Sequence, residues 1–108
     1  MGNEIFITDD GLNDEPGRTP DAEHVQICKD WLATFTKPRK TINDRMGSYG
    51  LKHVVERWAG EYVTNGAFVK AAVEMGYRYR RIHGGPNAFF NLSWPRRRSS
   101  QWREAGFR

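Results

Sequence analysis

The chain has 108 residues and a formal net charge of +4, the size of one domain with a modest core. It contains no run of about 18 apolar residues, which a membrane span requires, and its first residues lack the basic and apolar regions of a secretion signal. Its single cysteine excludes an internal disulfide and a cysteine-based zinc site. We therefore expect a cytoplasmic protein with no membrane partner, cofactor or metal.

The charges are distributed unevenly along the chain. Residues 1–36 carry eight acidic and two basic side chains, whereas residues 37–108 carry 15 basic and five acidic ones. This asymmetry favours a polyanionic partner for the C-terminal two-thirds of the chain. The alternative is a solvated basic face that is balanced by the acidic segment lying across it.

Residues 1–18 are acidic and rich in glycine and asparagine. Residues 4–8 have the composition of one short edge strand. Residues 9–17 consist largely of turn formers and offer little apolar surface to bury. The sequence predicts a mobile acidic arm.

A first helix is predicted from about residue 20 to Phe35. Thr19 suits the capping position and Pro20 the first helical position. The helix must end near Lys37, because the following proline disfavours helical backbone there. Residues 37–47 are then predicted to form a basic linker. The apolar stripe of this helix contains Val25, Cys28, Leu32 and Phe35.

A second helix is predicted from Ser48, which suits a cap, to Gly60, which suits the left-handed residue at a helix end. Lys52, Glu56 and Arg57 take its outer face, and His53 is a helical neighbour of Glu56. Because no nucleophile is indicated beside them, a surface ion pair is favoured over a catalytic base. The apolar face contains Leu51, Val54, Val55 and Trp58.

A third helix is predicted from Thr64 or Asn65 to Gly76, after a connection of only a few residues. Its inner face contains Phe68, Ala71, Ala72 and Met75.

A β-hairpin is predicted after the third helix. Residues 77–82 alternate aromatic and basic side chains, as a half-exposed strand does, and residues 83–87 are turn formers. The second strand places Phe90, Leu92 and Trp94 on one face. The predicted fold is α+β: three helices followed by a β-hairpin, similar to a winged helix-turn-helix, over residues 19–94. Residues 1–18 form the acidic arm, and residues 95–108 form a basic tail, which is mobile in isolation unless Trp102 and Phe107 pack back onto the domain. The predicted core contains Trp58, Phe68, Phe90 and Leu92.

Three separated segments carry a resemblance to known proteins. They are residues 48–53 (SYGLKH), 62–68 (YVTNGAF) and 86–91 (PNAFFN). This pattern, over about half the chain, resembles small proteins of phages and mobile elements that have no settled function. The resemblance implies a small inhibitor of host defence, of the anti-CRISPR type. Separately, the order of elements is similar to that of winged-helix DNA-binding domains.

The first functional hypothesis is a nucleic-acid-binding module, for DNA or RNA, with low sequence specificity. The third helix approaches a groove through its polar side chains, and arginines of the hairpin and tail contact phosphate. Few base-reading side chains imply little discrimination among sequences. The predicted site residues are Asn65, Lys70, Arg78, Arg80, Arg81, Arg96, Arg97, Arg98 and Trp102.

The second hypothesis is a protein inhibitor of a host nucleic-acid machine. In this case the acidic arm imitates nucleic acid, or the basic face covers an acidic surface of a host nucleic-acid-binding complex. Catalysis is not expected, because the sequence shows no paired carboxylates, metal-ligand cluster or activated nucleophile.

Overall fold

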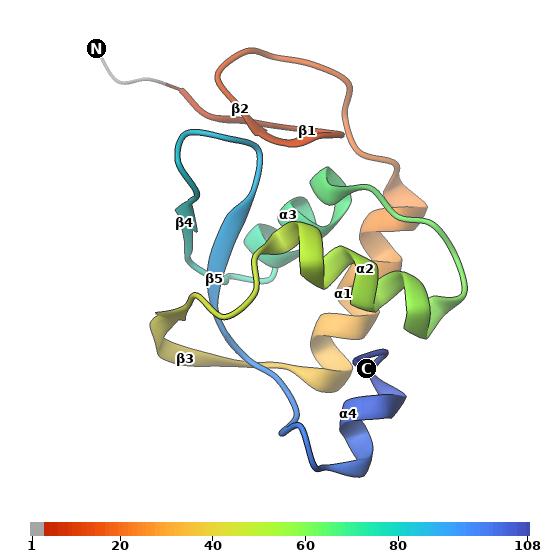
Figure 1. Cartoon of the computed structure of the whole chain (residues 1–108). Helices are drawn as coiled ribbons and strands as arrows, with labels where there is room; N and C mark the ends of the chain where they lie inside the picture. Colours follow the sequence, from red (N-terminus) through yellow and green to blue (C-terminus); the bar gives the residue numbers. More distant parts are fainter. Residues whose placement is uncertain (1–3) are drawn as a thin grey trace.

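All three predicted helices form in the computed structural model, which describes residues 4–108 (Figure 1). They are α1 (Ala22–Phe35), α2 (Ser48–Ala59) and α3 (Asn65–Glu74). Two of the predicted end signals are confirmed. Thr64 caps α3 by accepting a hydrogen bond from the backbone N–H of Ala67, and Gly60 ends α2 with φ +69°.

Two other helix starts differ from the prediction. Asp21 caps α1 in place of Thr19, because its carboxylate accepts hydrogen bonds from the N–H groups of Glu23 and His24. Ser48 lies inside α2, where its hydroxyl accepts a hydrogen bond from the backbone N–H of Ala88 at 3.1 Å. Ser48 therefore ties α2 to a strand that is distant in sequence.

A three-stranded antiparallel sheet packs beside the helices. Its strands are β3 (Lys37–Asn43), β4 (Tyr79–Arg81) and β5 (Ala88–Ser93), in the order β3-β5-β4. The predicted hairpin forms as β4–β5, and in it Tyr79 lies opposite Phe90. The prediction of a linker over residues 37–47 was wrong for its first part, because Lys37–Asn43 form strand β3. Its proline is tolerated because β3 is an edge strand, where Pro38 lies opposite Leu92.

The acidic N-terminal segment forms a second sheet, the hairpin β1 (Phe6–Thr8) and β2 (Gly11–Asn13). This hairpin packs on the start of α3. The carbonyl oxygen of Asp9 accepts from the N–H of Gly66 at 2.9 Å, and Leu12 is 2% exposed. The prediction of a mobile arm is therefore corrected for residues 4–18. Residues 1–3 lie outside the described part.

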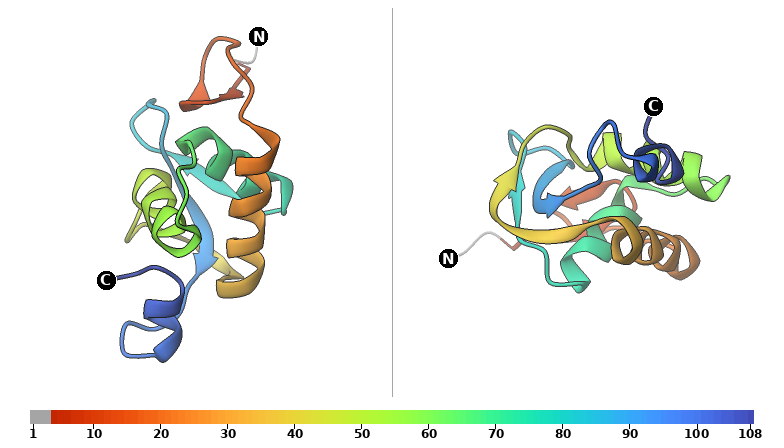
Figure 2. Two further views of the ribbon diagram at one scale, coloured as in Figure 1. Left: turned by 90° about the vertical axis from the view of Figure 1, so that its right-hand side faces the viewer. Right: turned by 90° about the horizontal axis from the view of Figure 1, so that it is seen from below.

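Residues 95–108 also fold back on the domain, which confirms the alternative in which Trp102 and Phe107 pack onto it and corrects the mobile tail. They contain a short helix, α4 (Ser100–Glu104), followed by buried Ala105 and Phe107. The indole N–H of Trp31 donates to the carbonyl oxygen of Ala105 at 2.7 Å. Figures 1 and 2 place α4 at one end of the molecule and the β1–β2 hairpin at the other.

The core lies between α1, α2, α3 and the inner face of β5. Phe68, Phe90 and Leu92 are at most 1% exposed, as predicted. Three residues on helix faces differ from the prediction. Trp58 is only partly buried and contacts the core through Phe35, Met75 is 39% exposed, and Lys52, assigned to the outer face, is 5% exposed. The fully buried tryptophan is Trp31.

Gly66 lets the β1–β2 hairpin approach α3. A Cβ atom at this position would lie 1.7 Å from the carbonyl oxygen of Thr8. Gly66→Ala is therefore expected to lower the free energy of unfolding by about 1–3 kcal/mol, although alanine has the higher helix propensity. Urea denaturation measures this effect. The matched control is Gly85→Ala, whose added Cβ would meet its nearest heavy atom at 3.4 Å. Equal stability of the two variants would contradict the close contact.

Candidate functional site

A basic groove of about 620 Å³ lies at the end of the molecule that carries α4. It runs between the β3–α2 connection and the tail after β5. We call it the arginine groove. Its lining residues are Arg39, Asn43, Asp44, Arg45, Met46, Ser93, Trp94, Pro95, Arg96, Arg97, Trp102 and Arg108.

The groove is strongly positive, because five arginines line it against one acidic side chain, that of Asp44. That carboxylate lies 3.8 Å from the guanidinium of Arg80, which partly offsets its charge. Within residues 4–108, the guanidinium groups of Arg45, Arg96 and Arg97 have no hydrogen-bonding or ion-pair partner. These groups are free to contact an anion.

The tail is held in place by aromatic packing, and this packing fixes the groove. The rings of Trp102 and Phe107 stack with centroids 4.1 Å apart, and Trp94 lies 5.8 Å from Phe107. The indole N–H of Trp102 donates to the carbonyl oxygen of Arg108. Arginines that are far apart in sequence therefore meet on one surface.

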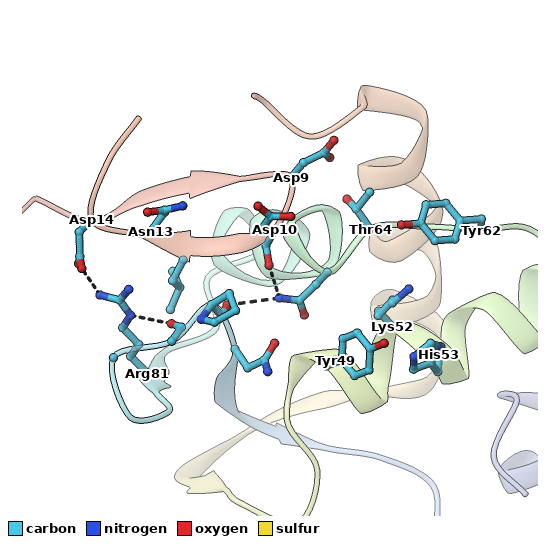
Figure 3. Close-up of a pocket in the computed structure, with 16 residues that line it drawn as sticks. Asp9, Asp10, Asn13, Asp14, Tyr49, Lys52, His53, Tyr62, Thr64 and Arg81 are labelled. Carbon is cyan, nitrogen blue, oxygen red and sulfur yellow. Dashed lines mark hydrogen bonds and ion pairs between the residues drawn. The ribbon is translucent and has the colours of Figure 1, made fainter. Parts of the chain in front are cut away.

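A second, larger depression of about 1010 Å³ lies between the β1–β2 hairpin, α2 and the turn from β4 to β5 (Figure 3). We call it the polar cleft. Its lining residues are Asp9, Asp10, Leu12, Asn13, Asp14, Tyr49, Lys52, His53, Tyr62, Thr64, Asn65, Arg81, Gly84, Gly85, Pro86 and Asn87.

A charged network on α2 forms one wall of the polar cleft. The ammonium of buried Lys52 lies 3.1 Å from Glu56 Oε2, and His53 Nδ1 lies 2.8 Å from Glu56 Oε1. The backbone N–H of Val63 also donates to this carboxylate. Burial alone would raise the pKa of Glu56. The hydrogen bonds from Lys52, His53 and Val63 outweigh burial, so the pKa lies below its ordinary value of 4.5.

The Glu56 network predicts a pH-dependent contribution to stability. Because the pKa of Glu56 is lowered by folding, its contribution is present above the unfolded pKa and is lost as the pH falls through the folded pKa. Glu56→Gln is expected to cost about 1–3 kcal/mol at neutral pH. The difference from the native protein should shrink below the folded pKa. Urea denaturation over this pH range measures it, with Glu61→Gln on the exposed turn as control. A pH-independent difference would contradict the network's role.

Comparison with protein-family models, curated proteins and solved structures gave no match. The helices within residues 4–108 are all too short or too polar to cross a lipid bilayer. The same residues contain no group of three or more His, Cys, Asp or Glu side chains arranged to hold a metal ion.

The predicted site residues of α3 do not form an exposed face. Asn65 is 6% exposed, and its amide nitrogen donates to the carbonyl oxygens of Asp10 and Pro86. Lys70 is half-buried. The β1–β2 hairpin covers the start of this helix, which corrects the expectation that α3 enters a groove of DNA through Asn65.

The predicted arginines of the β4–β5 hairpin are partly engaged inside the protein. Arg81 donates to the Asp14 carboxylate at 2.8 Å and to the Gly85 carbonyl at 2.7 Å, and its side chain is 18% exposed. Arg78 donates to the carbonyl oxygen of Lys40. Arg80 is more open, with 58% of its side chain exposed.

The predicted tail residues lie at or beside the arginine groove. Arg96, Arg97 and Trp102 line it, and Arg98 is exposed next to them. Arg39 and Arg45, from the segment predicted as a linker, also line it. Their positive charge is evident from the sequence, but their position beside the tail is not. One feature of the sequence could have indicated the network beside the polar cleft. Lys52 precedes Glu56 by four residues, a spacing at which oppositely charged side chains on a helix form an ion pair.

Proposed function

We propose that this protein binds nucleic acid through the phosphate backbone, in the arginine groove. The observation that carries this proposal is the meeting of five arginines from β3, the β3–α2 connection and the tail in one groove. Guanidinium groups present several donors in a rigid fork that matches phosphate oxygens. The surplus of basic residues after residue 36 extends this positive surface.

The groove supports low sequence specificity. Its one amide side chain, Asn43, donates to the carbonyl oxygen of Leu92 and accepts from the N–H of Arg45. Both of its polar groups are therefore engaged and are not available to read base edges. Contacts to phosphate position a nucleic acid but carry no sequence information.

The topology supports a winged-helix-like core in this proposal. The order α1, β3, α2, α3, β4, β5, with the sheet order β3-β5-β4, is similar to that of winged-helix DNA-binding domains. The β1–β2 hairpin is an addition that covers the start of α3. Binding in this protein is therefore assigned to the arginine groove rather than to α3.

Fluorescence anisotropy with labelled oligonucleotides tests the proposal. Two single strands of unrelated sequence and their duplexes are titrated at about 50 mM salt, and similar affinities for both sequences are expected. A strong preference for one sequence would contradict backbone recognition. Absence of binding to every oligonucleotide would overturn the proposal. Copurification of one host protein complex would then favour a protein inhibitor.

A further inference from the structure

The polar cleft contains three buried acceptor oxygens without a hydrogen-bonding partner. Within residues 4–108 they are Oδ1 of Asp9, Oδ1 of Asn65 and Oδ1 of Asn87, and all three residues line the cleft. An unpaired buried polar atom is unfavourable, so a cluster of them in one cleft indicates an interaction that the chain itself does not supply.

The orientation of the Asn65 amide is fixed by its neighbours. Its nitrogen lies 2.7 Å from the carbonyl oxygen of Asp10 and 3.3 Å from that of Pro86. Only the NH₂ group can donate to these two acceptors, so the opposite atom must be the oxygen. Asn65 is 6% exposed, so this oxygen is a buried, unpaired acceptor on a residue that lines the cleft.

The two permanently charged donors of the cleft are already engaged. Lys52 is held by Glu56, and Arg81 is held by Asp14 and by the carbonyl oxygen of Gly85. The carboxylate of Asp10 has no ion-pair partner among residues 4–108. The lining carries three carboxylates against these two cations, so an anionic ligand is disfavoured.

Aromatic rings at the rim complete the arrangement. Tyr49 and Tyr62 are 54% and 63% exposed. The ammonium of Lys52 lies 5.4 Å from the ring centroid of Tyr49 and 4.6 Å from that of Tyr62. These rings already contact one cation, and their exposed surfaces are suited to a second one. Figure 3 shows Lys52 and both tyrosines on the same side of the cleft, across from Arg81.

We propose that the polar cleft binds a positively charged N–H donor, a guanidinium or a primary ammonium group. Such a group donates to Asn65 and Asn87, pairs with the free carboxylate of Asp10 and lies against the tyrosine rings. Its source is either an arginine or lysine side chain of a partner protein or a free polyamine. This site is separate from the arginine groove and does not depend on nucleic-acid binding.

Two-dimensional NMR titration tests the site. The probes are Nα-acetyl-arginine methylamide, Nα-acetyl-lysine methylamide and spermidine, and the matched anionic control is Nα-acetyl-aspartate methylamide. The cationic probes are expected to shift the amide signals of residues 9–14 and 84–87 saturably, with a Kd of about 1 mM. Tighter binding of the amino-acid probes would identify a protein side chain as the source, and tighter binding of spermidine a polyamine.

Substitutions locate the binding. Asn87→Ala is chosen because the Asn87 side chain makes no hydrogen bond within residues 4–108 and alanine keeps the backbone bond from Ile82 to residue 87. We expect Asn87→Ala and Asp10→Asn each to weaken binding of the arginine probe by about tenfold. Glu15→Gln removes a charge from the neighbouring segment outside the cleft and should have no effect. Unchanged binding in Asn87→Ala, or an equal response to the aspartate probe, would overturn the proposal.

Discussion

Trp31→Ala is expected to lower the free energy of unfolding by about 3–5 kcal/mol, the range for deleting a large aromatic side chain from a core. Trp31 is fully buried, and its ring lies 6.0–6.2 Å from the rings of Phe35, Phe68 and Phe107. The substitution also removes the indole donor to the buried carbonyl of Ala105. One side chain thus joins α1, α3 and the folded tail.

The matched control for this prediction is Trp58→Ala. Trp58 is only partly buried and makes one aromatic contact, with Phe35 at 5.9 Å. Urea denaturation of both variants should show the larger loss for Trp31→Ala. Equal losses would contradict the central place of Trp31 in the core.

The second large effect concerns nucleic-acid affinity. Arg96→Ala combined with Arg97→Ala is expected to weaken binding by about 10- to 60-fold near 0.1 M salt, because two phosphate contacts are lost. The effect should be the same for unrelated sequences. The matched control combines Arg18→Ala with Arg103→Ala, which removes the same charge from exposed positions outside the groove. Equal weakening by both pairs would show that net charge, rather than the arginine groove, determines affinity.

The helices and the β4–β5 hairpin could be predicted because their signals are local. The cap at Thr64, the left-handed Gly60 and the alternation before the turn each involve residues within a few positions of one another. Strand β3 was missed because its side chains are basic and it contains Pro38. Its pairing with β5 depends on residues about 50 positions away.

The packing of both chain ends could not be predicted from local pattern. The β1–β2 hairpin packs on α3 because Gly66 lacks a side chain, and a glycine near a helix start has no such implication by itself. The tail folds back through Ala105 and Phe107, which are spaced too sparsely to form a periodic pattern. Because the contact of the β1–β2 hairpin with α3 is not evident from local pattern, Asn65 was expected on an exposed face. Because the packing of the tail is not evident either, the arginine groove was not predicted as one surface.

The salt dependence of binding tests the central claim most directly. If about four of the five groove arginines contact phosphates, log affinity against log salt concentration should fall with a slope of about −3.6 for duplex DNA and about −2.8 for a single strand. In the Arg96→Ala, Arg97→Ala variant the duplex slope should flatten by about 1.8, whereas the Arg18→Ala, Arg103→Ala variant should keep the native slope. A native slope near zero, or absence of binding at low salt, would contradict nucleic-acid binding through the arginine groove.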